Sequence, residues 1–344
     1  MERVPRILYS VRKDGLGARL KALAWVWRLA RRADARAVIA WPPTDPALRP
    51  RLGLTMPLGE IFDLQELAFS RDIGLRLVPD RMRMEPHWPT LCSGDRRGVQ
   101  VIDPATVFVD SPVLVHRGLQ TLLLPGETMA EGVREVGTLL RSLPLAPALL
   151  AALDATRPET PYVAAHYRGG DLLVGIIAAA RKLGTGSEDL GALDSALNFY
   201  AMKCMPLADF LACVEEEIGR GRRVYTAVDD ADVLADVRAR YGDALVEGAD
   251  EGLTPLQAAM LDLVMQSRAQ QIRAAPSGFA LAASLYGTTP IIPAPIPAGF
   301  AAFAADLRRV LGGAGVDEAA TAFVIARLAA NDHMQRRLAR TRRG

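Results

Sequence analysis

The sequence predicts an α/β protein with two units of parallel sheet, for three reasons. Short apolar segments that are expected to be strands alternate with segments whose apolar residues recur at helical spacing, as in parallel α/β sheets. This alternation begins near residue 6, is interrupted at Thr156–Pro161 by a segment with two prolines, and starts again at residue 162. A length of 344 residues suits two domains or one large one.

The first unit, expected to span residues 1–157, opens as a strand, a helix and a second strand. Arg6–Val11 and Ala35–Trp41 are predicted strands, because each is a short and mostly apolar run. Ala18–Arg32 is a predicted helix with one apolar face. That face is formed by Leu16, Leu20, Leu23, Trp27 and Ala30. Residues 42–57 are rich in proline and are expected to be a loop. Short helix or strand pieces are expected at residues 61–69, 76–78, 98–102 and 106–109, and further helices are expected at 127–142 and 148–155.

The second unit, expected to span residues 158–300, repeats the alternation of strand and helix. Its predicted strands are Tyr162–His166, Arg223–Val228, Gln271–Ala275 and Thr289–Ile292. Its predicted helices are 207–220, 231–240, 255–267 and 279–285. Polar or glycine-containing segments follow three of these strands. Because ligands bind beyond the carboxyl ends of strands in open parallel sheets, those segments are candidate binding residues.

Residues 301–344 are expected to be a helical segment that packs back on the rest of the chain. Asp317–Arg340 is predicted to be one helix with a narrow apolar stripe, which favours docking on a domain surface. The stripe comprises Ala319, Phe323, Ala326, Ala330 and Met334. The arginines in the later part of this helix are expected to be solvated. The alternative is a weak contact with an anionic membrane surface, which salt would remove.

The composition excludes several classes of protein. Three cysteines without a C-x-x-C pair argue against a disulfide framework and against a cysteine zinc site. Four histidines without an H-x-x-x-H pair make a histidine metal centre improbable, so no metal and no other cofactor is expected. The N-terminal segment lacks the apolar region of a signal peptide, and apolar runs such as Leu172–Ala180 are too short to cross a bilayer. We therefore expect a cytoplasmic protein.

The net charge of +2 conceals an uneven distribution. The first 36 residues hold ten basic and three acidic side chains, and the last 18 hold six basic and one acidic, so the central part is acidic. A protein that binds nucleic acid along its whole surface is usually more uniformly basic, so no nucleic-acid partner is expected. Basic ends suit an anionic small ligand or an anionic membrane surface, and they are equally compatible with solvated helix faces.

The most informative segment is His166-Tyr167-Arg168-Gly169-Gly170-Asp171, where a buried strand is expected to meet a loop. Two glycines allow backbone N–H groups to approach an anion closely. Arg168 keeps its charge and can hold a diphosphate through two parallel hydrogen bonds. Asp171 can orient Arg168 or accept a hydroxyl group. The structural alternative is a tight turn with an arginine–aspartate pair on the surface.

Two further segments also follow predicted strands. Asp229 and Asp230 come after Arg223–Val228 and can bind sugar hydroxyls or a base edge, although Asp230 can instead cap the next helix. Ser277 and Gly278 precede a predicted helix whose N-terminus is a site for an anion. A serine that caps this helix and a serine that binds phosphate have the same geometry, so these two roles do not compete.

A glycine loop follows the first predicted strand and contains Arg12, Gly15 and Gly17. The G-x-G spacing resembles a dinucleotide-binding fingerprint, but position 20 is leucine, where a third glycine is required. Trp41 also stands where an acidic residue would hold a ribose, so NAD binding is rejected. The sequence has no P-loop motif and no G-x-S-x-G motif.

These segments together resemble the α1,6-fucosyltransferase family, including the nodulation fucosyltransferases. The resemblance rests on SVRKDGLGARLKALAWVWRLA, HYRGGD, VYTAVDDADVL and LDLVMQSRAQQIRAAPSGFALAASLYG, which come in the family's order and spacing. It covers most of residues 6–292, although its motifs are short and residues 42–160 add nothing diagnostic. The family turn often carries more basic residues than this chain has, because Gly169 and Gly170 follow Arg168 directly.

The resemblance implies two facing Rossmann-like domains of the GT-B type with a cleft between them. It implies GDP-fucose as the donor without a metal, an inverting transfer to a glycan, and an acceptor side within residues 1–157. The implied catalytic residues are Arg168 and Asp171. The implied donor-binding residues are His166, Arg168, Gly169, Gly170, Asp229, Asp230, Asp262, Ser277 and Gly278, and the early glycine loop of Arg12, Gly15 and Gly17 also matches.

Three readings follow from these residues. The leading one is a metal-independent fucosyltransferase, or a glycosyltransferase that uses another nucleotide sugar. The second is a non-catalytic protein that binds a nucleotide sugar or an anion on the same fold, because a fold alone does not decide function. The third is a peripheral membrane scaffold that uses its basic ends. Turnover of a GDP-sugar separates the first reading from the second.

Overall fold

The computed structural model describes residues 5–12, 15–41, 58–69, 73–75, 89–92, 98–156, 158–249, 251–275, 277–293 and 299–341. The chain divides into two compact units, which we describe separately. Unit 1 comprises residues 1–157, 248–268 and 278–289, and unit 2 comprises residues 158–247, 269–277 and 290–344. Both units contain parallel sheets with helices, so the mixed α/β class predicted from the sequence is correct.

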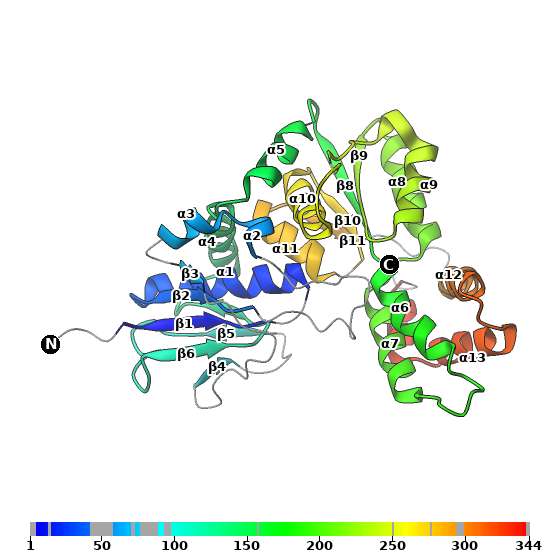
Figure 1. Cartoon of the computed structure of the whole chain (residues 1–344), viewed down its shortest axis with the longest axis horizontal. Helices are drawn as coiled ribbons and strands as arrows, with labels where there is room; N and C mark the ends of the chain where they lie inside the picture. The colour runs from blue at the N-terminus through cyan, green and yellow to red at the C-terminus, as the bar shows by residue number, and fades with distance from the viewer. Residues whose placement is uncertain are drawn as a thin grey trace. The chain divides into compact units, whose positions relative to one another are not determined.

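Unit 1 is built on a five-stranded sheet in the order β3-β2-β1-β6-β4, in which all pairs are parallel (Figure 1). Its strands are β1 (Ile7–Ser10), β2 (Arg36–Ile39), β3 (Ile73–Leu75), β4 (Thr90–Cys92) and β6 (Val113–His116). A separate parallel pair joins β5 (Val99–Val101) and β7 (Thr121–Leu123). The sequence did not predict β6 or β7, and Thr106–Val109, expected to be a short regular piece, contains no strand. The expected piece at residues 76–78 lies outside the described residues.

Seven helices of the described chain belong to unit 1. They are α1 (Leu16–Arg32), α2 (Leu58–Ile61), α3 (Leu64–Phe69), α4 (Met129–Arg141), α5 (Pro147–Ala155), α10 (Pro255–Arg268) and α11 (Gly278–Gly287). The central helix is α1, which packs on β1 and β2 and also on α4 and α11 (Figure 1). Because neighbours cover it on several sides, even Arg19 and Arg28 are buried within it.

The division into units differs from the expected boundary at residue 158 in one respect. Helices α10 and α11 lie far along the sequence but pack with α1, α4 and α5, so they are part of unit 1. Their apolar side chains, such as Leu256 and Met260, are fully buried there. Along the chain, α10 therefore belongs to unit 1, β10 to unit 2, and α11 again to unit 1. Burial against unit 1, which the sequence of α10 does not reveal, determines this path.

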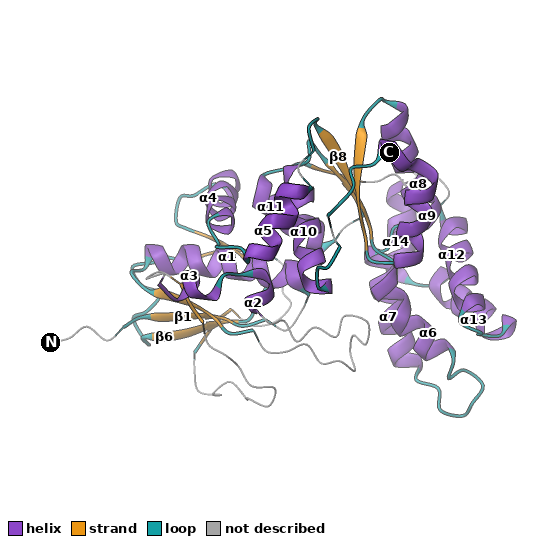
Figure 2. Cartoon of the chain, turned by 45° about the horizontal axis from the view of Figure 1, so that its top comes forward, coloured by secondary structure: helices purple, strands orange, loops and turns teal. Residues whose placement is uncertain are grey.

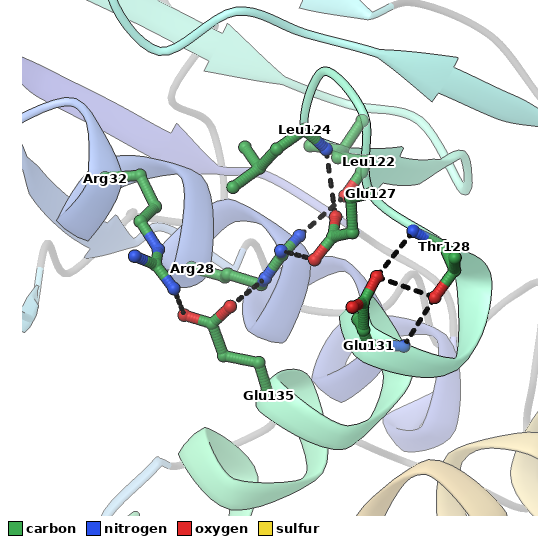
Figure 3. Close-up of polar contacts among 8 residues, drawn as sticks. All are labelled: Arg28, Arg32, Leu122, Leu124, Glu127, Thr128, Glu131 and Glu135. Atoms are coloured by element: carbon green, nitrogen blue, oxygen red, sulfur yellow. Dashed lines mark hydrogen bonds and ion pairs between the residues drawn. The ribbon is translucent and has the colours of Figure 1, made fainter.

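A buried ion-pair cluster joins α1 to α4 within unit 1 (Figure 3). Arg28 is only 1% exposed, and its Nε donates to Glu135 Oε2 at 2.8 Å while Nη2 donates to Glu127. Glu127 also accepts the N–H of Leu124 at 2.9 Å. Burial raises the pKa of Glu135, but the hydrogen bonds from Arg32 and Arg28 lower it by more than burial raises it. The pKa of Glu135 is therefore below its usual value. The start of α4 is fixed by a capping box between Thr128 and Glu131 (Figure 3).

Unit 2 is built on a four-stranded parallel sheet in the order β11-β10-β8-β9. Its strands are β8 (Tyr162–Tyr167), β9 (Arg223–Val228), β10 (Ile272–Ala274) and β11 (Ile291–Pro293). Helices α8 (Leu207–Gly219) and α9 (Ala231–Tyr241) pack on β8 and β9, and the short 3₁₀ helix Gly242–Ala244 follows α9. The remaining helices are α6 (Gly170–Ala180), α7 (Leu190–Lys203), α12 (Phe300–Gly313), α13 (Glu318–Ala329) and α14 (Asp332–Thr341), and they pack on one another (Figure 2).

The C-terminal segment differs from the single helix that the sequence predicts. It forms α13 and α14, because the side chain of Asn331 accepts the N–H groups of His333 at 3.0 Å and Met334 at 3.3 Å and so starts a new helix. The predicted stripe is also displaced: Phe323 is 40% exposed, whereas Val324 and Leu328 are buried. Both stripes are apolar in sequence, and packing against α6, α7 and α12 selects the second.

Two of the arginines in this segment are not simply solvated. Arg327 forms an ion pair with Asp194 of α7, with Nε 2.8 Å from Oδ1. Arg337 donates to the carbonyl oxygen of Ala201 at 2.9 Å and lies over the ring of Phe303, with its guanidinium carbon 5.1 Å from the ring centroid. Both contacts fix the segment to the helices of unit 2.

We expect a chain that ends at residue 316 to unfold at a clearly lower temperature than a chain that ends at residue 341. The shorter chain lacks Val324, Leu328 and Met334, which are all fully buried. Each buried aliphatic side chain contributes about 1.5–3 kcal/mol. Thermal unfolding followed by circular dichroism measures the difference. Equal melting temperatures would show that this segment does not contribute to the stability of unit 2.

One stretch of the described chain, Leu190–Gly219, is long and apolar enough to cross a membrane by length and composition alone. In the structure it is two helices, α7 and α8, separated at Cys204–Pro206. Leu193, Leu197 and Phe210 within it are buried in the cores of unit 2. A single stretch of this kind is weak support for a membrane span.

Candidate functional site

The carboxyl ends of three neighbouring strands in unit 2 carry the residues that the sequence singled out. In the register of the sheet, His166 of β8 lies between Ala227 of β9 and Ala274 of β10. Arg168 therefore follows β8 at the same edge at which Asp229 follows β9. Ser277, which is buried, follows β10. The parallel topology thus brings these segments to one edge, although Arg168 and Ser277 are more than a hundred residues apart in sequence.

Asp229 joins two of these segments directly. Its Oδ1 accepts the N–H of Gly169 at 3.0 Å, so the aspartate after β9 holds the turn after β8. Asp230 acts differently: its Oδ1 accepts the N–H groups of Asp232 at 3.1 Å and Val233 at 3.3 Å, which caps α9. The helix-capping role considered for Asp230 is present in the structure.

Lack of space for a side chain, and not backbone conformation, requires glycine at position 169. Its φ of −137° is accessible to any residue. A Cβ at this position would overlap the hydroxyl of Tyr167 and lie 2.6 Å from Cζ of that ring. The next residue, Gly170, begins α6, and Leu173 donates its N–H to the carbonyl oxygen of Gly169 at 3.0 Å. Gly169 is therefore held between β8, β9 and α6. The side chain of Asp171, a predicted catalytic residue, lies outside the described part of the structure.

The other predicted residues lie in unit 1. Gly15 is the N-cap of α1, and Gly17 lies two residues further along, in the first turn. A Cβ at Gly17 would lie 2.8 Å from the carbonyl oxygen of Gly278 and 2.8 Å from Cα of Phe279, so the N-termini of α1 and α11 adjoin. Two helix N-termini, neither with an acidic residue in its first turn, make this a positive region of unit 1. Asp262 is on α10, and therefore also in unit 1.

Arg12 lies at the carboxyl end of β1, where it is buried and donates to the carbonyl oxygen of Arg117. Its neighbour across the sheet edge is His116, a fully buried residue of β6 that pairs with Ser10 of β1. Burial first, and then the charge of Arg12, lower the pKa of His116 to about 4. No motif in the sequence points to His116, which is a lone histidine at the end of a strand that was not predicted.

We expect His116 to make unit 1 less stable in mild acid. The unfolded histidine takes up a proton near pH 6.5 and the folded one near pH 4, so the free energy of unfolding falls as the pH is lowered between these values. The full effect is about 3 kcal/mol. Urea unfolding at pH 7 and pH 4.5 measures it in the wild type and in His116→Gln. If the free energy of unfolding falls equally steeply in His116→Gln, groups other than His116 cause the loss of stability in acid.

A cavity of about 410 Å³ lies elsewhere in unit 1, where α4, α10 and α11 end. Its lining residues are Arg141, Ser267, Arg268, Tyr286, Gly287 and Thr288, and none of them belongs to the predicted site. Arg141 donates to the carbonyl oxygen of Tyr286, which satisfies the end of α11. Arg141 and Arg268 are the last residues of α4 and α10, where a cation is stabilised by the helix dipole, so their positions need no ligand to explain them.

The part of the chain that the structure describes contains no cluster of three or more His, Cys, Asp or Glu side chains able to hold a metal ion. Tyr167 contacts the glycine turn from within the sheet, although no motif in the sequence points to it. Its buried position in β8 predicts a core residue, and only the three-dimensional contact with Gly169 reveals a further role.

No family model matches the chain, and no curated protein matches it in sequence. Among solved structures it is similar to the fucosyltransferase NodZ from Bradyrhizobium, with 18% identity, a TM-score of 0.48, and coverage of 85% of this chain and 96% of that one. It is also similar to a mutant of Arabidopsis thaliana FUT1 in complex with GDP, with 11% identity, a TM-score of 0.49, and coverage of 86% and 72%. The similarity to POFUT1 has 12% identity, a TM-score of 0.42, and coverage of 86% and 100%. Likenesses at this level do not establish a family.

Proposed function

We propose that the protein is a metal-independent glycosyltransferase that transfers fucose from GDP-fucose to a glycan with inversion. The hydrogen bond between Asp229 and Gly169 is the observation that carries this proposal. It unites the aspartate pair and the H-x-R turn, two motifs of the fucosyltransferases that the sequence resembles, at the carboxyl edge of one parallel sheet.

The chemistry of the transfer matches the residues at this edge. The donor's diphosphate gains negative charge as the sugar leaves, and fixed cations and N–H donors stabilise that charge. In the proposal Arg168 is the cation, because a guanidinium stays charged and can bind two phosphate oxygens at once. The starts of α6 and of the helix after Ser277 supply N–H groups. His166 and Asp230 are proposed to line the nucleotide, together with Asp262.

The acceptor side is proposed to lie in unit 1, with the glycine loop of Arg12, Gly15 and Gly17. We propose a GT-B arrangement of the two units and a cytoplasmic location. Contact of the basic C-terminal residues with an anionic membrane would bring the enzyme to a lipid-linked acceptor. That contact is electrostatic, so flotation with anionic vesicles should be slight and should disappear at moderate salt.

We expect GDP to bind more tightly than UDP, and EDTA to leave transfer unchanged. The aspartates after β9 suit a guanine or ribose edge, and the adjacent D-D pair differs from the D-x-D pattern of metal-dependent transferases. Calorimetry measures the affinities for GDP and UDP. The rate of GDP release from GDP-fucose, with and without EDTA, measures the metal requirement. A preference for UDP would exclude the fucosyl donor. Full and reversible loss of transfer in EDTA would exclude a metal-free reaction, and binding without any turnover would leave a nucleotide-sugar-binding protein.

A further inference from the structure

The cavity where α4, α10 and α11 end carries more positive charge than its surroundings neutralise. Its volume of about 410 Å³ suits a small molecule. Among the described residues that line it are two arginines, Arg141 and Arg268, and no aspartate or glutamate. The helix dipoles explain why these arginines stand at helix ends, but each of the three ends offsets only about half an elementary charge. Part of the positive charge therefore remains for a ligand.

The two arginines differ in their partners. Arg141 donates to the carbonyl oxygen of Tyr286 and, at 3.3 Å, to Oγ1 of Thr138, so both of its acceptors are neutral. Arg268 is exposed and forms no hydrogen bond or ion pair within the part of the chain that the structure describes. A guanidinium group presents five N–H donors in a planar fork. The fork of Arg268 is therefore available to a ligand.

Tyr286 lies within range of both charges. Its side chain is only 7% exposed, and its hydroxyl forms no hydrogen bond with any described residue. Burial raises the pKa of Tyr286, and the charges of Arg268 and Arg141 oppose this rise. Both guanidinium groups therefore act on the same phenol, which stays neutral and can donate a hydrogen bond to an anion.

The turn after α11 is strained where it lines the cavity. Thr288 has a φ of 61°, in the left-handed region that a β-branched residue rarely adopts. Its two neighbours are held against the end of α10: a Cβ on Gly287 would overlap the carbonyl oxygen of Ser267, to which Oγ1 of Thr289 donates at 2.5 Å. Strain of this kind concentrates at ligand sites, and N–H groups beside a left-handed residue favour anions.

The cavity is separate from the predicted site residues of unit 1. Gly17 of the glycine loop adjoins Gly278 at the N-terminus of α11, whereas the cavity lies at the C-terminus of that helix. The ten residues of α11 span about 15 Å. A ligand in the cavity would therefore not occupy the region of the glycine loop.

We propose that this cavity is a binding site for a small organic phosphate, held by Arg268, Tyr286 and Arg141. A phosphate ester has up to two negative charges and three terminal oxygens, which suits two arginines and a phenol better than a carboxylate with one charge. Arg268 binds two of the oxygens as a fork, and the hydroxyl of Tyr286 donates to the third. Arg141 adds its charge while it remains bonded to the end of α11. The site is independent of the proposed transfer reaction.

Calorimetry at fixed ionic strength tests the site with three probes. Glycerol 3-phosphate should bind most tightly, inorganic phosphate more weakly because it lacks the organic part, and glycerate, which has a carboxylate instead, most weakly. Arg268→Gln should weaken the binding of glycerol 3-phosphate by about tenfold or more, and Tyr286→Phe by about three- to tenfold. The matched control is Arg134→Gln, which removes an exposed arginine of α4 that does not line the cavity. It should leave the affinity unchanged.

Several results would overturn the proposal. If the wild type does not bind glycerol 3-phosphate at about 10 mM, there is no such site. Equal losses in Arg268→Gln and Arg134→Gln would reduce the effect to the general charge of unit 1. Tighter binding of glycerate than of glycerol 3-phosphate would exclude phosphate as the ligand class. Unchanged binding in both Arg268→Gln and Tyr286→Phe would remove these residues from any site.

The affinity for GDP separates this site from the proposed function. Arg268→Gln should bind GDP as the wild type does, because the cavity is not the nucleotide site. If the wild type binds glycerol 3-phosphate as expected but does not bind GDP, the cavity site stands and the proposed function fails. A loss of GDP affinity in Arg268→Gln as large as the loss for glycerol 3-phosphate would overturn the proposal of a separate site.

Discussion

Replacing Arg168 by alanine is expected to slow transfer from GDP-fucose by about 10²–10³-fold, the usual effect of removing one preorganised group that stabilises transition-state charge. Arg168 follows a fully buried strand, next to the turn that Asp229 holds, so its backbone position is well defined. Arg168→Lys should remain strongly impaired, because an ammonium group keeps the charge but loses the planar, two-pronged geometry.

Rates of GDP release under single-turnover conditions measure this effect. Arg240→Ala is the control, since Arg240 lies in unit 2 and forms an exposed ion pair with Asp236 on the same helix. Its variant should react as the wild type does. Near-normal transfer by Arg168→Ala, with its fold intact, would remove Arg168 from the reaction.

Replacing Arg28 by methionine is expected to destabilise the protein by about 3–5 kcal/mol, the typical effect of removing one partner from a buried ion pair. The guanidinium is 1% exposed and bonds to Glu127, to Glu135 and, at 3.2 Å, to the carbonyl oxygen of Leu122. Methionine fills the space but leaves the carboxylate of Glu127, which is 11% exposed, without its cation.

Arg32 provides a matched control within the same cluster (Figure 3). Its side chain is 54% exposed and pairs with Glu135, so Arg32→Ala should change the free energy of unfolding by about 0–1 kcal/mol. Adding Glu127→Gln to Arg28→Met should restore part of the loss, because it removes the stranded charge. Urea unfolding measures all four proteins. Equal, small losses in Arg28→Met and Arg32→Ala would show that the buried cluster adds nothing beyond a surface ion pair.

The regular elements of unit 2 were largely predictable from local sequence. The predicted strand Arg223–Val228 has the observed bounds, and the helix predicted at 207–220 is α8, Leu207–Gly219. Helices α6 and α7 were not predicted, because both carry apolar residues on several sides and so lack the one-sided pattern of a surface helix. In α7, Leu190 and Phe199 are apolar but exposed. The short strands β6 and β7 were also not predicted, because a run of three or four apolar residues does not distinguish a strand from other buried segments.

The sequence by itself determined the α/β class, most strands and helices, and the candidate residues, because local periodicity and turn chemistry act over a few residues. It could not determine that α10 and α11 pack in unit 1, since their apolar side chains fit any apolar surface and only tertiary packing selects one. Nor could it separate the roles of Asp229 and Asp230. These adjacent residues are both aspartates, but the end of β9 directs one carboxylate to Gly169 and the other to the first turn of α9. A hydrogen bond across 60 residues exists only once the parallel sheet has brought two strand ends together.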